Sequence, residues 1–171
     1  MKIFFFFLLI PLWIGLGGCS QAPDSRESNK GISSRDIAPP QPYLFLIPPE
    51  VSLWLNTREK DLGAYSVVIL FDPSIVQVAE VKGGNAPFNG PPYVNREDFT
   101  KGKLRIMAYH TDEEGPRGQT LVARIQFKGL QEGISPLRIL VETLSTPEGK
   151  PLKPRYFLSF NQVEVISRYG Q

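Results

Sequence analysis

The sequence predicts an all-β protein, an antiparallel jelly-roll type of β-sandwich with about nine strands. Short runs of β-branched and aromatic residues recur along the chain, and Gly, Pro, Asn or Asp separates each run from the next. Within several runs apolar and polar residues alternate, as in a strand with one buried face. Apolar residues keep no helical spacing for longer than a turn or two. Short strands at this spacing, without helices, are typical of antiparallel sandwiches.

The most strand-like segment is 64–71, which follows Gly63 and ends at Asp72-Pro73. Proline has no amide hydrogen to donate to a strand ladder, so the strand should end there. Alternation divides its side chains into two apolar sets, Tyr65, Val67, Ile69 and Phe71 on one face and Val68 and Leu70 on the other. This strand is therefore either covered on both faces or carries an exposed apolar patch.

Turn signals delimit the remaining expected strands, which are 43–47, 51–57, 75–81, 103–110, 120–128, 136–143 and 161–166. Alternation in 51–57 places Val51, Leu53 and Leu55 inward and Ser52, Trp54 and Asn56 outward. Alternation in 103–110 separates Leu104, Ile106 and Ala108 from Arg105, Met107 and Tyr109. Loops rich in proline, glycine or acidic residues are expected at 88–93, 112–118 and 147–154.

The first residues have the pattern of a lipoprotein signal peptide. Lys2 precedes an apolar stretch, 3–16, that is too short for a transmembrane helix. The following Gly17-Gly18-Cys19 resembles a bacterial lipobox, which implies palmitate-type acylation of Cys19 and anchoring outside the cytoplasm. Ser20 after the cysteine, by resemblance to lipoproteins of two-membrane bacteria, favours the outer membrane, facing the periplasm or the cell surface.

Composition divides the rest of the chain into a tether and one domain. We expect a signal peptide at 1–18, a lipidated flexible tether at 19–42, a folded domain at 43–167 and a short tail at 168–171. Removal of Lys2 lowers the net charge from +2 to +1, so nucleic acid is not an expected partner. Since Cys19 is the only cysteine, stability must come from a packed core rather than from disulfides.

Several motifs, in order, resemble the strands of a cohesin domain. Gly63-Ala64-Tyr65 to Phe71-Asp72-Pro73-Ser74, followed by Val78, Val81 and Gly83-Gly84, resembles the third and fourth strands. The sixth to ninth strands have their counterparts in 102–106, 118–127, 133–144 and 163–165, so the resemblance covers about 43–166. It implies a nine-stranded jelly roll related to cellulose-binding modules. It also implies a sheet face that binds a dockerin, usually in polysaccharide breakdown. Two departures are the short region before the central strand and the lone domain on a lipid anchor.

The sequence gives little support to catalysis, and we expect no enzyme, no cofactor and no metal. His110 is the only histidine, and no serine lies in a Gly-x-Ser-x-Gly context, so neither a triad nor a zinc site can be assembled. We expect His110 to be exposed at a loop edge. Calcium at Asp112-Glu113-Glu114, or at Glu97-Asp98, is the weaker interpretation, because adjacent carboxylates usually solvate a turn. A glycosidase carboxylate pair cannot be assigned from sequence.

Three binding functions remain. The outward residues of the strands that face the partner in cohesins predict docking of a dockerin-like or envelope protein; they are Ser66, Val68, Leu70, Arg105, Met107, Tyr109, Arg138, Leu140 and Glu142. Polysaccharide capture would need an exposed row of aromatic rings, for which the candidates are Trp54, Tyr93, Tyr109 and Tyr156. A structural role in an envelope or secretion assembly would need an unpaired edge strand.

Overall fold

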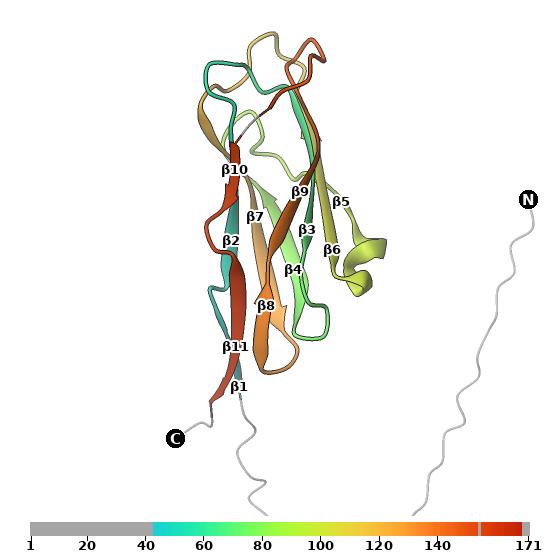
Figure 1. Ribbon diagram of the computed structural model, residues 1–171, viewed down its shortest axis with the longest axis vertical. Coiled ribbons are helices and arrows are strands. Elements are labelled where there is room, and N and C mark those ends of the chain that lie inside the picture. The colour runs from blue at the N-terminus through green and yellow to red at the C-terminus, as the bar shows by residue number, and fades with distance from the viewer. Residues whose placement is uncertain (1–42, 154, 169–171) are drawn as a thin grey trace, which may run out of the picture. The chain divides into compact units, whose positions relative to one another are not determined.

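The computed structural model describes residues 43–153 and 155–168, and Figure 1 shows their arrangement. The predicted signal peptide, Cys19 and the tether lie outside the described residues, as do residues 169–171. The described elements are, in order, β1 (Tyr43–Ile47), β2 (Glu50–Asn56), β3 (Ala64–Leu70), β4 (Val76–Gly83), β5 (Tyr93–Asn95), the 3-10 helix η1 (Arg96–Lys101), β6 (Lys103–Tyr109), β7 (Gln119–Gly129), β8 (Gly133–Pro136), β9 (Arg138–Ser145), β10 (Arg155–Leu158) and β11 (Gln162–Arg168).

The strands form an antiparallel sandwich, which confirms the predicted fold class. One layer is the sheet β5-β6-β3-β9. The other contains the sheets β10-β2-β7-β4 and β1-β11-β8, with β1 continuing the line of β2 beyond Pro48 and Pro49 (Figure 1). Between the layers the Tyr65 hydroxyl donates a 3.0 Å hydrogen bond from β3 to the Val122 carbonyl of β7.

The buried core is built from the inward side chains of both layers. Val51, Leu53 and Leu55 of β2 are fully buried, which confirms the predicted alternation of that strand. On the central strand β3, the side chains of Tyr65, Val67 and Ile69 point into the same core. Phe71, the residue after the end of β3, is also buried in it. The core cluster extends from Val51 to Val165, so the residues from 43 onward enclose a hydrophobic core of their own. Burial of this apolar surface is the main stabilising contribution.

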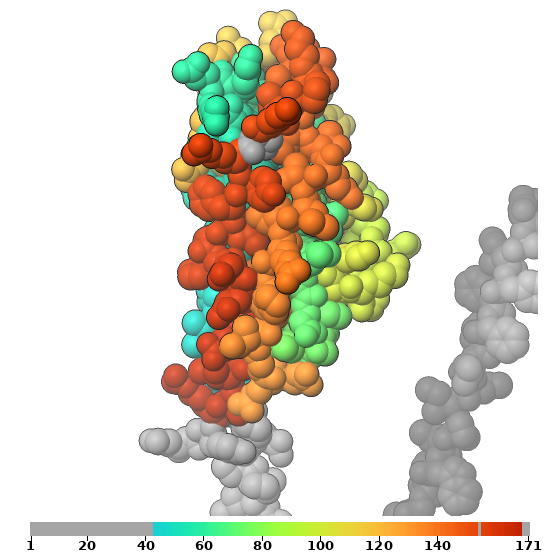
Figure 2. Space-filling model, viewed as in Figure 1, coloured from blue at the N-terminus to red at the C-terminus, as the bar shows by residue number. Residues whose placement is uncertain are grey.

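The segment 133–144, which resembles the eighth cohesin strand, changes sheets at Leu137. It contains β8, which pairs with β11, and most of β9, which pairs with β3, and the expected strand 136–143 lies mainly in β9. Between β8 and β9 Leu137 is buried, and its amide donates a 2.7 Å hydrogen bond to the Asn161 carbonyl. This segment therefore connects the two layers along one side of the sandwich. Figure 2 shows the C-terminal strands, in orange and red, covering that side.

Three elements were not expected. β5 begins at Tyr93, the last residue of the predicted loop 88–93, and β10 adds an edge strand next to β2. The short helix η1 contradicts the expectation of no helices: the Asn95 side chain accepts a hydrogen bond from the Glu97 amide at its start, and Gly102, at φ 69°, ends it. Within the described residues no helix has the length and apolar character that crossing a membrane requires.

Candidate functional site

The outer face of the sheet β5-β6-β3-β9, here called the β3 face, carries the residues predicted for a protein interface. Strand register places Val68 opposite Arg105 and Leu140, and Leu70 opposite Arg138. Met107 is opposite Ser66, and Tyr109 is opposite Ala64. Directly paired residues point to the same side of a sheet. The predicted interface residues are therefore neighbours on one face; they are Val68, Leu70, Arg105, Met107, Tyr109, Arg138 and Leu140.

Val68 departs from the expectation for an interface residue. It points outward, but only 6% of it is exposed, so its prediction as an accessible contact is wrong. Arg105 of β6 and Glu142 of β9 lie on either side of β3 and join across it, with Nε to Oε2 at 3.0 Å and Nη2 to Oε1 at 2.8 Å. This ion pair crosses the outer side of β3 beside Val68. The valine therefore packs beneath a charged bridge.

The bridge is held in its charged form. The Arg105 guanidinium, and then the Ser66 hydroxyl, donate hydrogen bonds that keep the pKa of Glu142 below its ordinary value. The same carboxylate raises the pKa of Arg105. Since both groups are charged at neutral pH and satisfy each other, the centre of the β3 face presents a closed ion pair rather than a free cation.

Exposed apolar side chains surround this ion pair. Leu140 is 51% exposed on β9, and Tyr109 is more exposed still on β6. Tyr93 of β5 is opposite Met107, and both line a shallow hollow with Tyr109, Pro91 and Pro92. The β3 face thus combines aromatic and aliphatic side chains with a fixed arginine, which is the usual makeup of protein interfaces.

The four carbohydrate candidates do not form one row. Tyr93 and Tyr109 lie on the β3 face, whereas Trp54 belongs to β2 and Tyr156 to β10, in the other layer. Trp54 is only half-buried and points outward, as alternation predicts. Its ring lies parallel to that of Phe157, with centroids 6.1 Å apart and planes 6° apart. Sequence reasoning missed Phe157, although the run Arg155-Tyr156-Phe157-Leu158 is strand-like and could have been noticed.

His110 is not the exposed loop-edge residue that was expected. Only 5% of its side chain is exposed, because Phe88 packs edge-to-face against the ring at 5.4 Å and Leu62 lies on another side. Nε2 lies 2.6 Å from the Leu62 carbonyl oxygen, which can only accept, so Nε2 carries a proton. Nδ1 is buried and has no hydrogen-bond partner among the described residues. Through this hydrogen bond, His110 connects the loop after β6 to Leu62, which precedes β3.

Of the acidic residues considered for calcium, Asp98 has a local structural role. In the described part of the chain, no three His, Cys, Asp or Glu side chains converge as a metal site requires. Asp112, Glu113 and Glu114 line a shallow hollow beside His110. Asp98 accepts hydrogen bonds from Lys101, at 3.1 Å, and from Asn95, at 3.0 Å, within η1. The Lys101 ammonium lowers the pKa of Asp98.

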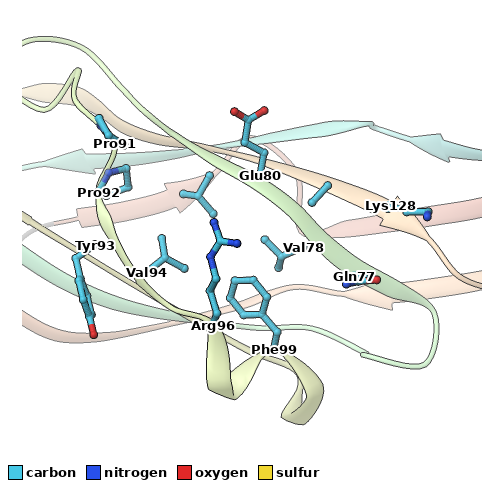
Figure 3. A pocket seen from close by; sticks show the side chains of 12 residues that line it. Gln77, Val78, Glu80, Pro91, Pro92, Tyr93, Val94, Arg96, Phe99 and Lys128 are labelled. Carbon is cyan, nitrogen blue, oxygen red and sulfur yellow. The ribbon is translucent and has the colours of Figure 1, made fainter. Parts of the chain in front are cut away.

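A groove opens between β4 and β5, the edge strands of the two layers. Figure 3 shows the Arg96 side chain directed into it beside Val78, Val94 and Phe99. Glu80 lies at its rim and is paired with Lys82 at 3.2 Å. The free edge of β4 has a β-bulge after Val78 and carries the charged side chains of Glu80 and Lys82. Bulges and charges at a sheet edge oppose pairing with a strand from another protein. The structure therefore gives no support to an assembly role through this edge.

The fold and the β3 face define a β-sandwich module with a flat, mixed apolar and charged surface. No family model matches the sequence, and neither does any curated protein. Among solved structures, one similar chain comes from a type I cohesin–dockerin complex of Clostridium thermocellum, with 17% identity, TM-score 0.52, and coverage of 68% of this chain and 84% of that one. A non-cellulosomal cohesin from Archaeoglobus fulgidus is 14% identical, with TM-score 0.50 and coverage of 70% and 82%. The domain therefore has the cohesin fold, as the sequence motifs predict.

Proposed function

We propose that this chain is a non-catalytic docking module that binds a partner protein through its β3 face. The observation that carries the proposal is the convergence of Leu140, Met107 and Tyr109 around the Arg105–Glu142 ion pair. The cohesin fold supports it, because the similar Clostridium thermocellum structure is a complex with a dockerin. We therefore expect a partner of the dockerin type.

The charges on the β3 face indicate what such a partner should present. Lys103 and Arg138 flank Leu70 on the two neighbouring strands, and Arg105 is neutralised by Glu142. A neutralised ion pair surrounded by apolar side chains, with Lys103 and Arg138 at the rim, suits a partner surface that has an apolar anchor and nearby carboxylates. Complementary rim charges mainly accelerate association, while the buried centre supplies most of the affinity.

The proposal places the module at the cell envelope. Acylation of Cys19 would anchor it outside the cytoplasm, in the outer membrane or at the cell surface, and residues 20–42 would connect the anchor to β1. A docked partner would then be held near the membrane without a membrane span in the module. This location rests on the signal-peptide pattern.

Polysaccharide binding is a second candidate function, and one specific observation favours it. The parallel rings of Trp54 and Phe157 lie on β2 and β10, next to the polar side chains Ser52 and Asn56. Parallel aromatic rings with polar neighbours are suited to stacking against pyranose rings and binding their hydroxyls. This surface belongs to the layer opposite the β3 face, so the two candidate functions can be tested separately.

The test is capture of a partner from envelope and secreted fractions, with residues 20–171 as bait, since they include the complete core. The matched variant is Leu140→Asp/Tyr109→Ala, which changes exposed side chains and should keep the wild-type melting curve. A protein retained only by the wild type supports docking and identifies the partner. Equal retention by the variant contradicts it. Retention on insoluble polysaccharide that Trp54→Ala/Phe157→Ala abolishes would favour the second function instead.

A further inference from the structure

The outer face of the sheet β1-β11-β8, here called the β11 face, is unusually apolar for a solvent-facing surface. On β1 the outward side chains are Tyr43, Phe45 and Ile47, which are 65%, 47% and 52% exposed. The inward residue Leu46 packs against the core instead. A half-buried strand normally alternates apolar inside and polar outside, so β1 departs from the usual pattern.

Strand register extends this surface across all three strands. Phe45 is opposite Ile166, and Ile47 is opposite Glu164, which in turn is opposite Ile134. Ile134 is half-exposed, so it continues the apolar surface onto β8. The result is a group of neighbouring apolar side chains on three strands, with Glu164 between Ile47 and Ile134, and a patch of this kind marks a binding surface.

Charges of both signs lie within the patch and do not give it a strong field. The Arg168 guanidinium lies 5.6 Å from the centre of the Phe45 ring, as in a cation–π contact. Glu164 provides one negative charge beside it, and the Glu132 carboxylate accepts a 2.8 Å hydrogen bond from the Ser167 amide. With charges of both signs present, the face is suited to a neutral apolar surface rather than to a strongly charged one.

We propose that the β11 face rests on the interfacial region of a lipid bilayer. The proposal rests on the proposed anchoring through Cys19, because β1 is the first strand after residues 20–42 and is therefore the strand joined to the anchor by the shortest length of chain. Aromatic and aliphatic side chains with an arginine whose head reaches water are the composition of interfacial contacts. Side chains standing on a flat sheet can reach the depth of roughly 5–10 Å that interfacial elements occupy.

This contact would orient the domain. The β11 face and the β3 face belong to opposite layers of the sandwich (Figure 1). With the β11 face on lipid, the β3 face is directed away from the membrane and stays accessible to a partner. A patch that bound a second copy of the chain instead would produce a dimer, and the two outcomes are distinguishable.

The test measures which face touches lipid. Cys19, the only cysteine, is coupled to a maleimide lipid in phosphatidylcholine vesicles, so the measurement does not depend on natural acylation. In residues 19–171 with Trp54→Phe as background, a single tryptophan is introduced by Phe45→Trp or, as the matched control, by Leu140→Trp. Brominated phosphatidylcholine quenches only indole groups that enter the bilayer.

We expect brominated lipid to reduce the emission of the Phe45→Trp protein about twofold or more and to leave that of the Leu140→Trp protein unchanged, because only the first site would lie at interfacial depth. Adding Tyr43→Ser and Ile47→Ser should abolish the quenching. Equal quenching of the two reporters by brominated lipid would overturn the proposal. So would the absence of quenching in both, together with a dimer in sedimentation equilibrium that the serine substitutions dissociate. Natural acylation of Cys19 is read separately by mass spectrometry, and the docking function by partner capture.

Discussion

Arg105 and Glu142 form a bidentate ion pair that spans the central strand of the β3 face, with both donor–acceptor distances at or below 3.0 Å. The two residues are 37 positions apart in the sequence. They lie on β6 and β9, the two strands on either side of β3. Their contact fixes the relative position of three strands at the centre of the proposed docking surface. It also accounts for the burial of Val68.

Acid should weaken this ion pair. Because the pKa of Glu142 is lowered in the folded protein, its contribution to stability is present above the ordinary glutamate value of 4.5 and is lost as pH falls through the lowered folded value. Glu142→Gln should therefore be less stable than the wild type at pH 7, and the two should converge in strong acid. Urea midpoints measured from pH 7 to pH 3 check this. A difference that stays constant across the range would contradict the assignment.

Val68 and Leu140 should respond very differently to the same substitution. Val68→Asp places a carboxylate at a buried position, and we expect it to lower the free energy of unfolding by about 2–4 kcal/mol. Leu140→Asp changes a half-exposed side chain, and its effect on folding should stay within about 0.5 kcal/mol. Chemical denaturation measures both. A severe loss in Leu140→Asp would mean that this side chain is needed for folding and cannot serve as a clean probe of docking.

The hydroxyl of Tyr65 should contribute to holding the layers together. Tyr65→Phe keeps the ring but leaves the Val122 carbonyl without the 3.0 Å hydrogen bond, so a loss of about 1–2 kcal/mol is expected. Burial raises the pKa of this phenol well above its ordinary value, so Tyr65 should stay protonated at a pH where an ordinary phenol ionises. Equilibrium unfolding measures the first effect, and ultraviolet titration measures the second. A variant as stable as the wild type would show that the hydrogen bond contributes nothing net.

The tautomer of His110 tests the hydrogen bond between its ring and the Leu62 carbonyl. With Nε2 donating to the Leu62 carbonyl, neutral His110 should adopt the tautomer that is protonated at Nε2. Long-range ¹H–¹⁵N correlation spectra distinguish the two ring nitrogens, and the chain has only one histidine to assign. Observation of the Nδ1–H tautomer would show that the Leu62 contact is not a hydrogen bond from the ring.

The sequence predicted the sandwich because strands such as β2 and β6 alternate buried and more exposed side chains. The inward set of β2 could be identified from this pattern alone. The shared face of Arg105, Met107 and Leu140 also required the resemblance to cohesin strands, because alternation within one strand does not say which strands are neighbours. Strand order and the change of sheet at Leu137 depend on pairing between segments that are distant in the sequence. No local sequence pattern predicts which segments pair. The helix η1 is too short to leave a periodic signal.

The site residues that were misplaced share one physical cause. Alternation tells which way a side chain points but not what lies over it. Val68 points outward yet is covered by an ion pair between two other strands, and His110 follows a strand end yet is covered by Phe88. Phe157 lies in a strand-like run, but its position opposite Trp54 follows from the pairing of β10 with β2, which no local pattern predicts.

The central claim is that the β3 face binds the partner, and affinity measurements with the captured protein test it most directly. Dissociation constants are compared for the wild type, Leu140→Asp/Tyr109→Ala on the β3 face and Trp54→Ala/Phe157→Ala on the opposite layer. We expect the first variant to bind at least about thirtyfold more weakly, as for loss of interface hot spots, and the second to bind within about twofold of the wild type. Unchanged affinity in the β3-face variant, with loss in the other, would contradict the account.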